Sequence, residues 1–302
     1  MRTPPAYLHL GPDELSRRAR AALGRLGACD LCGRRCLADR ASGRLLGSCR
    51  TGTRAVVASW GPHHGEEDPL RGRLGSGTVF FCSCNLACEY CQNFDVSWLG
   101  AGEEVGPEAL AGIFLDLQEA GCHNVNLVSP THVLPQVLEA LPLAVREGLS
   151  LPLVWNTGGY DSVEALSLLD GIVDVYMPDM KYADAETGLA LSGVRDYPAV
   201  NRAAVKEMHR QVGDLVLDDE GIAVHGLLVR HLVLPGSLAG SGEVFRFLAE
   251  EVSSRTFLNV MGQYRPAWRA RLHPPLDRRP TPQELFEALR LAARFGLTRL
   301  AR

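Results

Sequence analysis

Three cysteines lie close together in the sequence with the spacing C-x3-C-x2-C. They are Cys84, Cys88 and Cys91, and they follow directly on the apolar run 77–81, which is typical of a strand. Thiolates placed this closely on a tight loop can bind three irons of a cubane cluster. The fourth iron then has no protein ligand, and an open coordination position is where a metal site does chemistry. The pattern therefore predicts a reactive [4Fe–4S] cluster, with a zinc site or buried thiols as the alternatives.

A second group of cysteines lies near the N-terminus, with the spacing C-x2-C-x3-C-x12-C. Its members are Cys29, Cys32, Cys36 and Cys49. In a reducing compartment such groups bind metal or do redox chemistry more often than they form disulfides. Four thiolates suit both zinc and an iron–sulfur cluster. We predict a second metal site here rather than free thiols, with a slight preference for zinc or a structural role over iron.

The remaining two of the nine cysteines are Cys82 and Cys122. Cys82 lies at the end of the expected strand, where it either packs in the core or replaces Cys84 as the first ligand. Cys122 stands alone in the sequence, which indicates a structural role.

Composition excludes some classes of partner. The chain has 302 residues, 46% of them hydrophobic, so it can bury a sizeable core. Its net charge of −4 gives no basic field, and we expect neither a nucleic acid nor a membrane as partner. No apolar segment reaches the roughly 18 residues that span a bilayer. The first residues, Met1–Ala6, lack the apolar region of a signal peptide, so a cytoplasmic location is expected.

Strand-like and helix-like segments alternate along most of the chain. Apolar residues at helical spacing predict a first helix over 12–26. Six strands are then expected, at 78–81, 124–128, 152–155, 172–176, 227–234 and 257–261. The helices between and after them are expected at 107–120, 133–147, 162–169, 184–212, 242–253 and 282–293. This alternation predicts parallel βαβ units with right-handed crossovers.

The expected fold class is α/β. Six βα units are fewer than the eight that close a TIM barrel, so we predict an open, partial (β/α)6 barrel with a small N-terminal cysteine-rich segment. Residues 1–60 would form the N-terminal helix and the four-cysteine segment, and residues 61–302 the barrel. The polar stretch 60–69 is interpreted as a loop. Its His63, His64, Glu66 and Glu67 either donate to a substrate or metal, or form a solvated charge cluster.

Polar residues follow each of the six expected strands. In such a sheet the carboxyl ends of the strands converge on one face, so these residues should meet there. Arg230 and His231 alternate along the fifth strand, so only one of them should face the interior. Besides the cysteine loop, the polar strand ends are Ser129, Thr131 and His132; Asn156 and Thr157; Asp179 and Lys181; Arg230 and His231; Gln263 and Tyr264.

Several stretches together resemble one enzyme superfamily. They are the cysteine loop and its strand, Asn126-Leu-Val-Ser-Pro-Thr-His132, Gly171-Ile-Val-Asp-Val-Tyr-Met-Pro-Asp-Met-Lys-Tyr182 and Leu227-Leu-Val-Arg-His-Leu-Val-Leu-Pro-Gly236. The chain looks like the radical S-adenosylmethionine (SAM) superfamily, in its pyruvate formate-lyase activating enzyme branch, and is similar to the PflX-type uncharacterised subgroup. The four-cysteine segment also resembles the opening of that subgroup, so the likeness covers nearly the whole chain.

The resemblance implies roles for individual residues. Cys84, Cys88 and Cys91 would ligate the cluster, and Lys181 would contact the carboxylate or ribose region of SAM. The residues placed beside the adenine are Tyr90, Gln92 and Asn93. Those that align with a monovalent-cation site are Asn156, Thr157, Met177 and Asp179. Catalytic roles are expected for Lys181, Asp179, Arg230 and His231.

The chain departs from the family pattern at two places. Asn156 stands where the cation site has an aspartate. The usual Gly-Gly-Glu after the second strand is absent, and Ser129-Pro130-Thr131 lies where the amino group of SAM is normally met. Ser129 and Thr131 therefore become candidates for that contact.

The function implied is reductive cleavage of SAM to a 5′-deoxyadenosyl radical, which abstracts hydrogen from a protein or other substrate. Activation of a glycyl-radical enzyme is one such reaction. An external electron donor such as flavodoxin or ferredoxin is expected. One alternative is a radical SAM catalyst that acts on a small molecule or peptide. Another is a non-catalytic zinc or iron–sulfur protein with a structural or electron-transfer role.

Overall fold

Six parallel strands form the centre of the molecule. The computed structural model describes residues 4–43 and 47–301. Each strand pairs in parallel with the next one in the series, so all their carboxyl ends lie along one edge. These strands confirm the six expected from the sequence, with shifts of a few residues at their ends. In order across the sheet they are β2 (Ser76–Phe81), β4 (Val125–Val128), β5 (Leu153–Thr157), β6 (Val175–Pro178), β8 (Ala223–Leu232) and β9 (Phe257–Met261).

Three antiparallel strands extend this sheet. β1 (Ala55–His63) pairs with β2, β3 (Glu103–Val105) pairs with β1, and β7 (Val216–Leu217) pairs with β8. The interpretation of residues 60–69 as a loop is therefore wrong at its start, which belongs to β1, and at its end, where the short helix α2 begins at Asp68. The boundary expected between residues 60 and 61 falls inside β1. The Gly-Pro pair at 61–62 suggested a turn. Because β3 pairs only with 55–57, the later part of β1 is an edge strand, where proline is tolerated.

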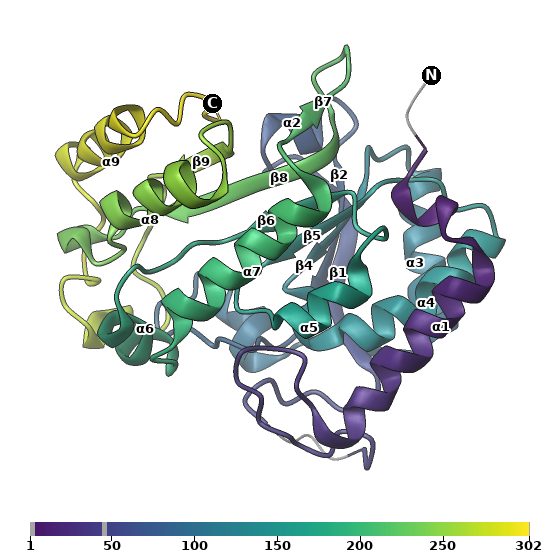
Figure 1. The fold of residues 1–302 in the computed structure, drawn as a ribbon. Coiled ribbons are helices and arrows are strands. Elements are labelled where there is room, and N and C mark those ends of the chain that lie inside the picture. Colours follow the sequence, from purple (N-terminus) through teal and green to yellow (C-terminus); the bar gives the residue numbers. More distant parts are fainter. Residues whose placement is uncertain (1–3, 44–46, 302) are drawn as a thin grey trace.

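Helices surround the sheet (Figure 1). α1 contacts α4, and α4 also contacts α3, so one side is covered by three packed helices. The apolar face of α3 is buried, with Leu110, Phe114 and Leu117 almost inaccessible. The helices are α1 (Gly11–Gly24), α2 (Asp68–Arg71), α3 (Pro107–Glu119), α4 (Leu134–Arg146), α5 (Val163–Leu166), α6 (Ala185–Ser192), α7 (Tyr197–Val212), α8 (Ser241–Phe247) and α9 (Pro282–Arg294).

Local sequence explains where several helices begin and end. The helical region expected at 184–212 is two helices, because Gly193 adopts a left-handed conformation (φ 63°) and ends α6. α9 begins at a capping box in which Thr281 and Glu284 each accept from the other's backbone N–H. Within the described residues, no helix has both the length and the apolar character needed to cross a membrane.

The segment between α1 and β1 has little regular structure and forms the loops at the bottom of Figure 1. The side chain of Arg40 is buried there and holds three parts of the chain together. It donates to the carbonyl oxygens of Thr51 (2.9 Å), Gly52 (3.2 Å) and His132 (2.7 Å). Hydrogen bonds to a charged donor are stronger than neutral ones, so this residue fixes the segment against the sheet.

Candidate active site

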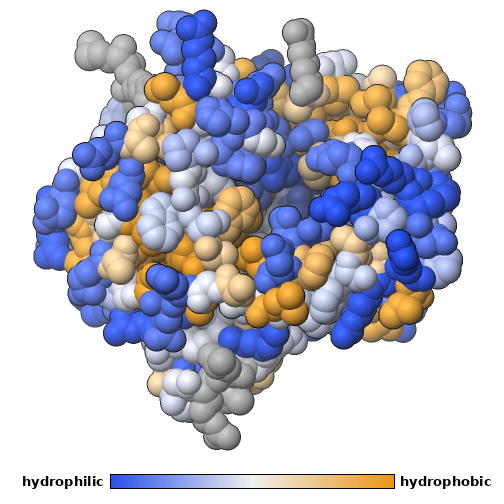
Figure 2. Space-filling model, turned by 180° about the vertical axis from the view of Figure 1, so that it is seen from behind, coloured by the Kyte–Doolittle hydropathy of each residue, from blue (hydrophilic) through white to orange (hydrophobic). Residues whose placement is uncertain are grey.

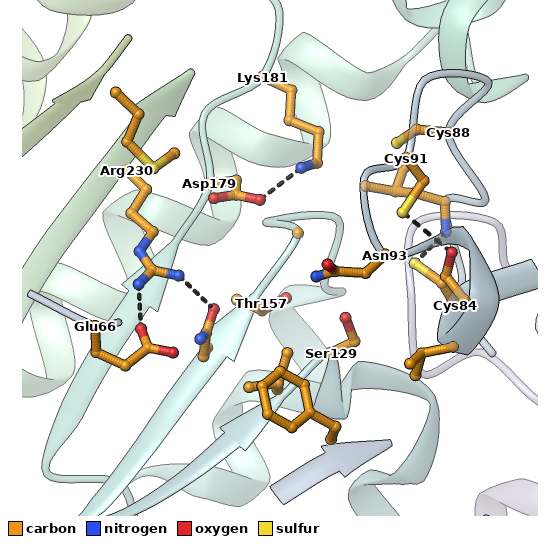
Figure 3. A pocket seen from close by; sticks show the side chains of 18 of the residues that line it. Glu66, Cys84, Cys88, Cys91, Asn93, Ser129, Thr157, Asp179, Lys181 and Arg230 are labelled. Carbon is orange, nitrogen blue, oxygen red and sulfur yellow. Dashed lines mark hydrogen bonds and ion pairs between the residues drawn. The ribbon is translucent and has the colours of Figure 1, made fainter. Parts of the chain in front are cut away.

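A cavity of about 790 Å³ lies at the carboxyl ends of the parallel strands. Side chains from all six strand ends contribute to it, as the convergence of parallel strands requires. Figure 3 shows the cysteines on one side of this cavity and Arg230 with Glu66 on the other. The face of the molecule turned away in Figure 1 is hollowed among mainly hydrophilic residues (Figure 2). The expected strand-end residues that line the cavity are Cys84, Cys88, Cys91, Ser129, Asn156, Thr157, Asp179, Lys181, Arg230 and Gln263.

The cysteine loop is tight, and each of its three sulfurs has a hydrogen-bond donor close by. Its turn places Ser83 (φ 71°) and Ala87 (φ 50°) in the left-handed region. The backbone N–H of Leu86 lies 3.4 Å from Cys84 Sγ. Hydroxyl groups approach the other two sulfurs at 3.1 Å, from Ser192 to Cys88 and from Ser97 to Cys91. Donors of this kind stabilise negative charge on sulfur, which is what metal-bound thiolates carry.

The three thiols suit a cluster better than a single ion. Burial, followed by repulsion from Cys88, raises the pKa of Cys84 to about 11, so without a metal this thiol is protonated at neutral pH. Across the described part of the chain, no three His, Cys, Asp or Glu side chains are placed to hold one metal ion. All three cysteines nevertheless line the same cavity. The sequence spacing C-x3-C-x2-C suits thiolates that each bind a different iron of a cubane better than it suits one tetrahedral ion.

An ion pair between Asp179 and Lys181 lies between Arg230 and the cysteine loop (Figure 3). Lys181 Nζ donates to Asp179 Oδ2 at 2.5 Å. Burial alone would lower the pKa of Lys181, but attraction to Asp179, and then to Cys88, outweighs it and holds the pKa well above its usual value. Tyr197 and Asn201 fix the backbone, since Tyr197 Oη and Asn201 Nδ2 lie 3.1 and 2.9 Å from Asp179 O. The cavity therefore contains a permanently charged ammonium group.

The opposite side of the cavity contains a buried ion cluster around Arg230. Its guanidinium donates twice to Glu67, both at 2.6 Å, and also to Glu66. Burial would raise the pKa of Glu67, but Arg230 lowers it overall, with help from Asn259. Arg230 Nη1 reaches Asn156 Oδ1 at 3.5 Å. Of the two interpretations of the 63–67 stretch, the solvated charge cluster is wrong for these glutamates, because both are buried against Arg230.

Some expected site residues lie outside the cavity. Tyr90 is buried among aromatic rings, and its hydroxyl is hydrogen-bonded to that of Tyr182 at 2.8 Å. Thr131 is buried in a network with Thr157 (2.9 Å) and Asp161 (2.8 Å). His231 faces away from Arg230, with its ring nitrogens at Met180 O (2.7 Å) and Ser241 Oγ (2.9 Å). The expectation that only one of Arg230 and His231 faces the interior is confirmed.

The remaining residues that the sequence singled out also differ in whether they line the cavity. Asn93 lines the cavity beside Cys91, whereas Gln92, Met177 and Tyr264 lie outside its lining. Cys82 is buried, lies outside the cavity, and packs as one of its two interpretations predicted. His132 is also buried, and burial lowers its pKa to about 4. The four N-terminal cysteines line a separate small cavity.

Three residues at the site were missed by the sequence interpretation. Ser97, in the short π-helix Asp95–Leu99, approaches Cys91, and Ser192, at the end of α6, approaches Cys88. Asn259, on β9, supports Glu67 from the far end of the sheet at 2.7 Å. Ser192 and Asn259 are far from their partners along the chain, so no local pattern could have indicated them.

Comparisons with known proteins find one relative by sequence and one similar fold that bear on the site. No protein-family model matches it. The uncharacterised protein MJ0674 of Methanocaldococcus jannaschii is 32% identical over 299 residues, which cover 96% of this chain and 81% of that protein. A crystal structure of a radical SAM methyltransferase from Sphaerobacter thermophilus has a similar fold, with a TM-score of 0.51 at 15% identity. That likeness covers 73% of this chain but only 64% of the other, and it shows that the two chains share a fold.

Proposed function

This chain belongs to the same family as the uncharacterised protein MJ0674 of Methanocaldococcus jannaschii, and we propose that it is a radical SAM enzyme. One observation carries the proposal. The three cysteines of the C-x3-C-x2-C loop share a single cavity with polar residues from the other five parallel strand ends. A structural or electron-transfer protein needs no such cavity beside its metal. The fold likeness to a radical SAM methyltransferase agrees with this assignment.

Cys84, Cys88 and Cys91 would hold a [4Fe–4S] cluster with one iron open to the cavity. When bound, the cluster and SAM together supply a reductive cleavage that yields a hydrogen-abstracting 5′-deoxyadenosyl radical. The protein orients the reactants and excludes competing reactions. Ser97 and Ser192 stabilise the anionic thiolates through their hydroxyl groups. An external donor such as flavodoxin or ferredoxin would supply the electron.

Lys181 and Asp179 are suited to the polar end of SAM. The ammonium of Lys181 remains charged and can bind a carboxylate, while Asp179 keeps it in place. Ser129 has a left-handed backbone (φ 57°) and lines the cavity at the position where the family's Gly-Gly-Glu is absent. We assign to it the contact with the amino group of SAM. Asn93, rather than the buried Tyr90, would lie beside the adenine.

The substrate would occupy the side of the cavity near Arg230, Glu66 and Glu67. Arg230 binds both glutamates and holds them in place, so the three side chains present a rigid polar wall with one net negative charge. We place the enzyme in the pyruvate formate-lyase activating branch, in its PflX-type subgroup, on the residue patterns of the strand ends. The six parallel strands, in sequential order, suit the partial barrel of that branch. Its substrate would be a protein, a peptide or a small molecule.

The test is formation of 5′-deoxyadenosine. The full chain is reconstituted anaerobically with iron and sulfide, reduced with dithionite and incubated with SAM. Cys88→Ala should abolish the product, whereas Cys82→Ala should keep it, because Cys82 is buried outside the cavity in the same loop. A fully loaded wild-type protein that forms no 5′-deoxyadenosine refutes the proposal.

A further inference from the structure

The four N-terminal cysteines surround one space that the proposed reaction does not use. Cys29, Cys32, Cys36 and Cys49 all line a small cavity next to the cysteine loop of the active site. They come from two stretches of chain that regular structure does not hold together. Arg40 joins them instead, because its guanidinium lies 3.5 Å from Cys29 Sγ and binds Thr51 O beside Cys49. Convergence of four thiols on one enclosed space indicates a bound metal centre.

A second observation points to the same occupant. His132 lines this cavity and is almost fully buried. Its Nε2 donates to the carbonyl oxygen of Cys82 at 2.9 Å, so the neutral ring carries a lone pair on Nδ1. Within the described residues Nδ1 has no hydrogen-bond partner. A buried polar atom without a partner is costly, so it marks a missing neighbour. Four sulfurs and one bare nitrogen are all electron-pair donors, as a metal requires.

The arrangement favours a cluster over a lone zinc ion. Zinc binds thiolates at about 2.3 Å in a tetrahedron, which brings its ligand atoms together around one point. In the ranges 4–43 and 47–301, no three His, Cys, Asp or Glu side chains are arranged to hold one ion. In a cubane each thiolate binds its own iron, so the sulfurs stand further apart.

We propose that Cys29, Cys32, Cys36 and Cys49 bind a second [4Fe–4S] cluster, which passes single electrons to the cluster at Cys84, Cys88 and Cys91. The binding site stands independently, whereas the electron acceptor rests on the proposed function. The reaction is a simple relay. A reduced donor protein of the flavodoxin or ferredoxin class gives one electron to the N-terminal cluster. The N-terminal cluster is then reoxidised when it passes this electron to the cluster at Cys84, Cys88 and Cys91. No bond changes and no proton is required.

The contacts between the two cysteine groups support this relay. Asn85 follows Cys84 directly, is buried, and lines the four-cysteine cavity, where its side chain hydrogen-bonds the Cys32 thiol. Its Oδ1 also lies 3.9 Å from Cys84 Sγ. One side chain therefore touches a ligand of each cluster. Cys36, in contrast, is exposed, which gives a donor protein access to the second cluster from the surface.

Arg34 fixes the distance between the two sites. It lies between Cys32 and Cys36 in the sequence, yet its guanidinium donates to Asn85 O and, at 3.2 Å, to Leu86 O in the active-site loop. It also donates to Ser192 O at 2.9 Å, and Ser192 is the residue whose hydroxyl approaches Cys88. Arg34 thereby attaches the N-terminal four-cysteine segment to the cysteine loop of the active site through backbone carbonyl oxygens.

The first test counts metals in the full chain. Protein expressed with iron supplementation and reconstituted anaerobically should contain about eight irons and eight sulfides per chain, because each cubane holds four of each. The double variant Cys29→Ser/Cys32→Ser should contain about half of both, and so should Cys88→Ala. Cys122→Ala is the matched control and should keep the full number, since Cys122 is buried away from both cavities.

A wild-type protein with about four irons and one zinc overturns the second cluster, and so does one with about four irons and no zinc. Because the wild type alone decides this, the result does not depend on whether the variants fold. Neither count involves SAM, so this proposal and the proposed reaction can fail separately.

The second test measures electron transfer. Reduced flavodoxin is mixed with the protein, and reduction of the clusters is followed by loss of their visible absorbance. Cys29→Ser/Cys32→Ser should lose fast reduction of the remaining cluster by flavodoxin but keep reduction by dithionite, which is small enough to enter the active-site cavity. Asn85→Leu should keep the full iron content and slow the flavodoxin reaction. Equal rates with flavodoxin in the wild type and in both variants overturn the relay.

Discussion

Replacing Arg230 with methionine should strongly destabilise the fold, because it leaves two carboxylates buried without their cation. Arg230 donates to Glu66 and twice to Glu67, and the side chains of the two glutamates are only 7% and 2% exposed. Methionine retains most of the apolar contact of the arginine stem, so the change isolates the charge.

The expected magnitude follows from the burial of this cluster. Removing one partner of a buried ion pair destabilises a protein by about 3–5 kcal/mol, chiefly through the uncompensated charge. Asn259 still donates to Glu67 at 2.7 Å, so the lower end of that range is expected. Adding Glu67→Gln to Arg230→Met removes one of the two uncompensated charges and should recover part of the loss.

The loss should depend on pH. In the wild type, Arg230 holds the pKa of Glu67 below its unfolded value of about 4.3, so this pair stabilises the protein above that pH and loses its effect as pH falls through the folded pKa. Without Arg230, burial dominates and should raise the pKa of Glu67 above 4.3. As pH falls, Glu67 becomes protonated and loses its uncompensated charge, so the Arg230→Met variant is destabilised less. The difference between wild type and Arg230→Met should be largest near neutral pH and smaller near about pH 5.

Urea unfolding, followed by circular dichroism at both pH values, measures this difference. Lys206→Met is the control, because Lys206 pairs with Glu251 at 2.5 Å where both side chains are about half exposed. Exposed pairs contribute about 0–1 kcal/mol, so that variant should change little at either pH. If Arg230→Met loses no more stability than Lys206→Met, or loses the same amount at both pH values, the buried ion cluster is wrong.

Two further changes test the geometry of the site. Gly159→Ala should lower the melting temperature, because Gly159 has a φ of 73° and a Cβ there would lie 2.4 Å from Asp179 O. The control Gly112→Ala lies in open space on α3 and should raise stability by about 0.5–1 kcal/mol. If thermal unfolding gives the reverse order, the backbone described around Asp179 is wrong. Lys181→Met should weaken SAM binding by about 1.5–3 kcal/mol in calorimetry while the iron content is unchanged, and equal affinity in both proteins argues against its contact with SAM.

The parallel sheet was predictable because its strands follow one another in both sequence and space. Each buried strand is a short apolar run, such as β2, and each is separated from the next by at least one helix. The position of polar residues after strands then placed Asp179 and Lys181 at the cavity without knowledge of their contacts.

Long-range contacts decided what could not be predicted. β1 forms because the edge of β2 supplies its hydrogen bonds, which overrides the turn signal of Gly61 and Pro62. Tyr90 was expected beside SAM on family resemblance, yet its ring packs against Tyr182 and Tyr264. Nothing in the sequence around Tyr90 indicates that the rings of Tyr182 and Tyr264, which are distant along the chain, pack against it.

Thr131 illustrates the same limit within the predicted site. It follows β4 as expected, but its hydroxyl binds Asp161, which lies 30 residues further on. Asp161 also accepts hydrogen bonds from Thr157 (2.6 Å) and Trp155 (3.2 Å), so this buried carboxylate is the shared acceptor for the polar side chains behind the cavity. A strand-end position predicts nearness to the site, whereas the partner decides which way the side chain turns.

In the proposed enzyme, the cluster at Cys84, Cys88 and Cys91 has an iron open to SAM in the cavity. Electron paramagnetic resonance of the dithionite-reduced full chain, recorded with and without SAM, tests this most directly. We expect SAM to change the spectrum of the wild type and of Cys82→Ala, and to leave that of Cys88→Ala unchanged. A wild-type spectrum that is the same with and without saturating SAM contradicts it.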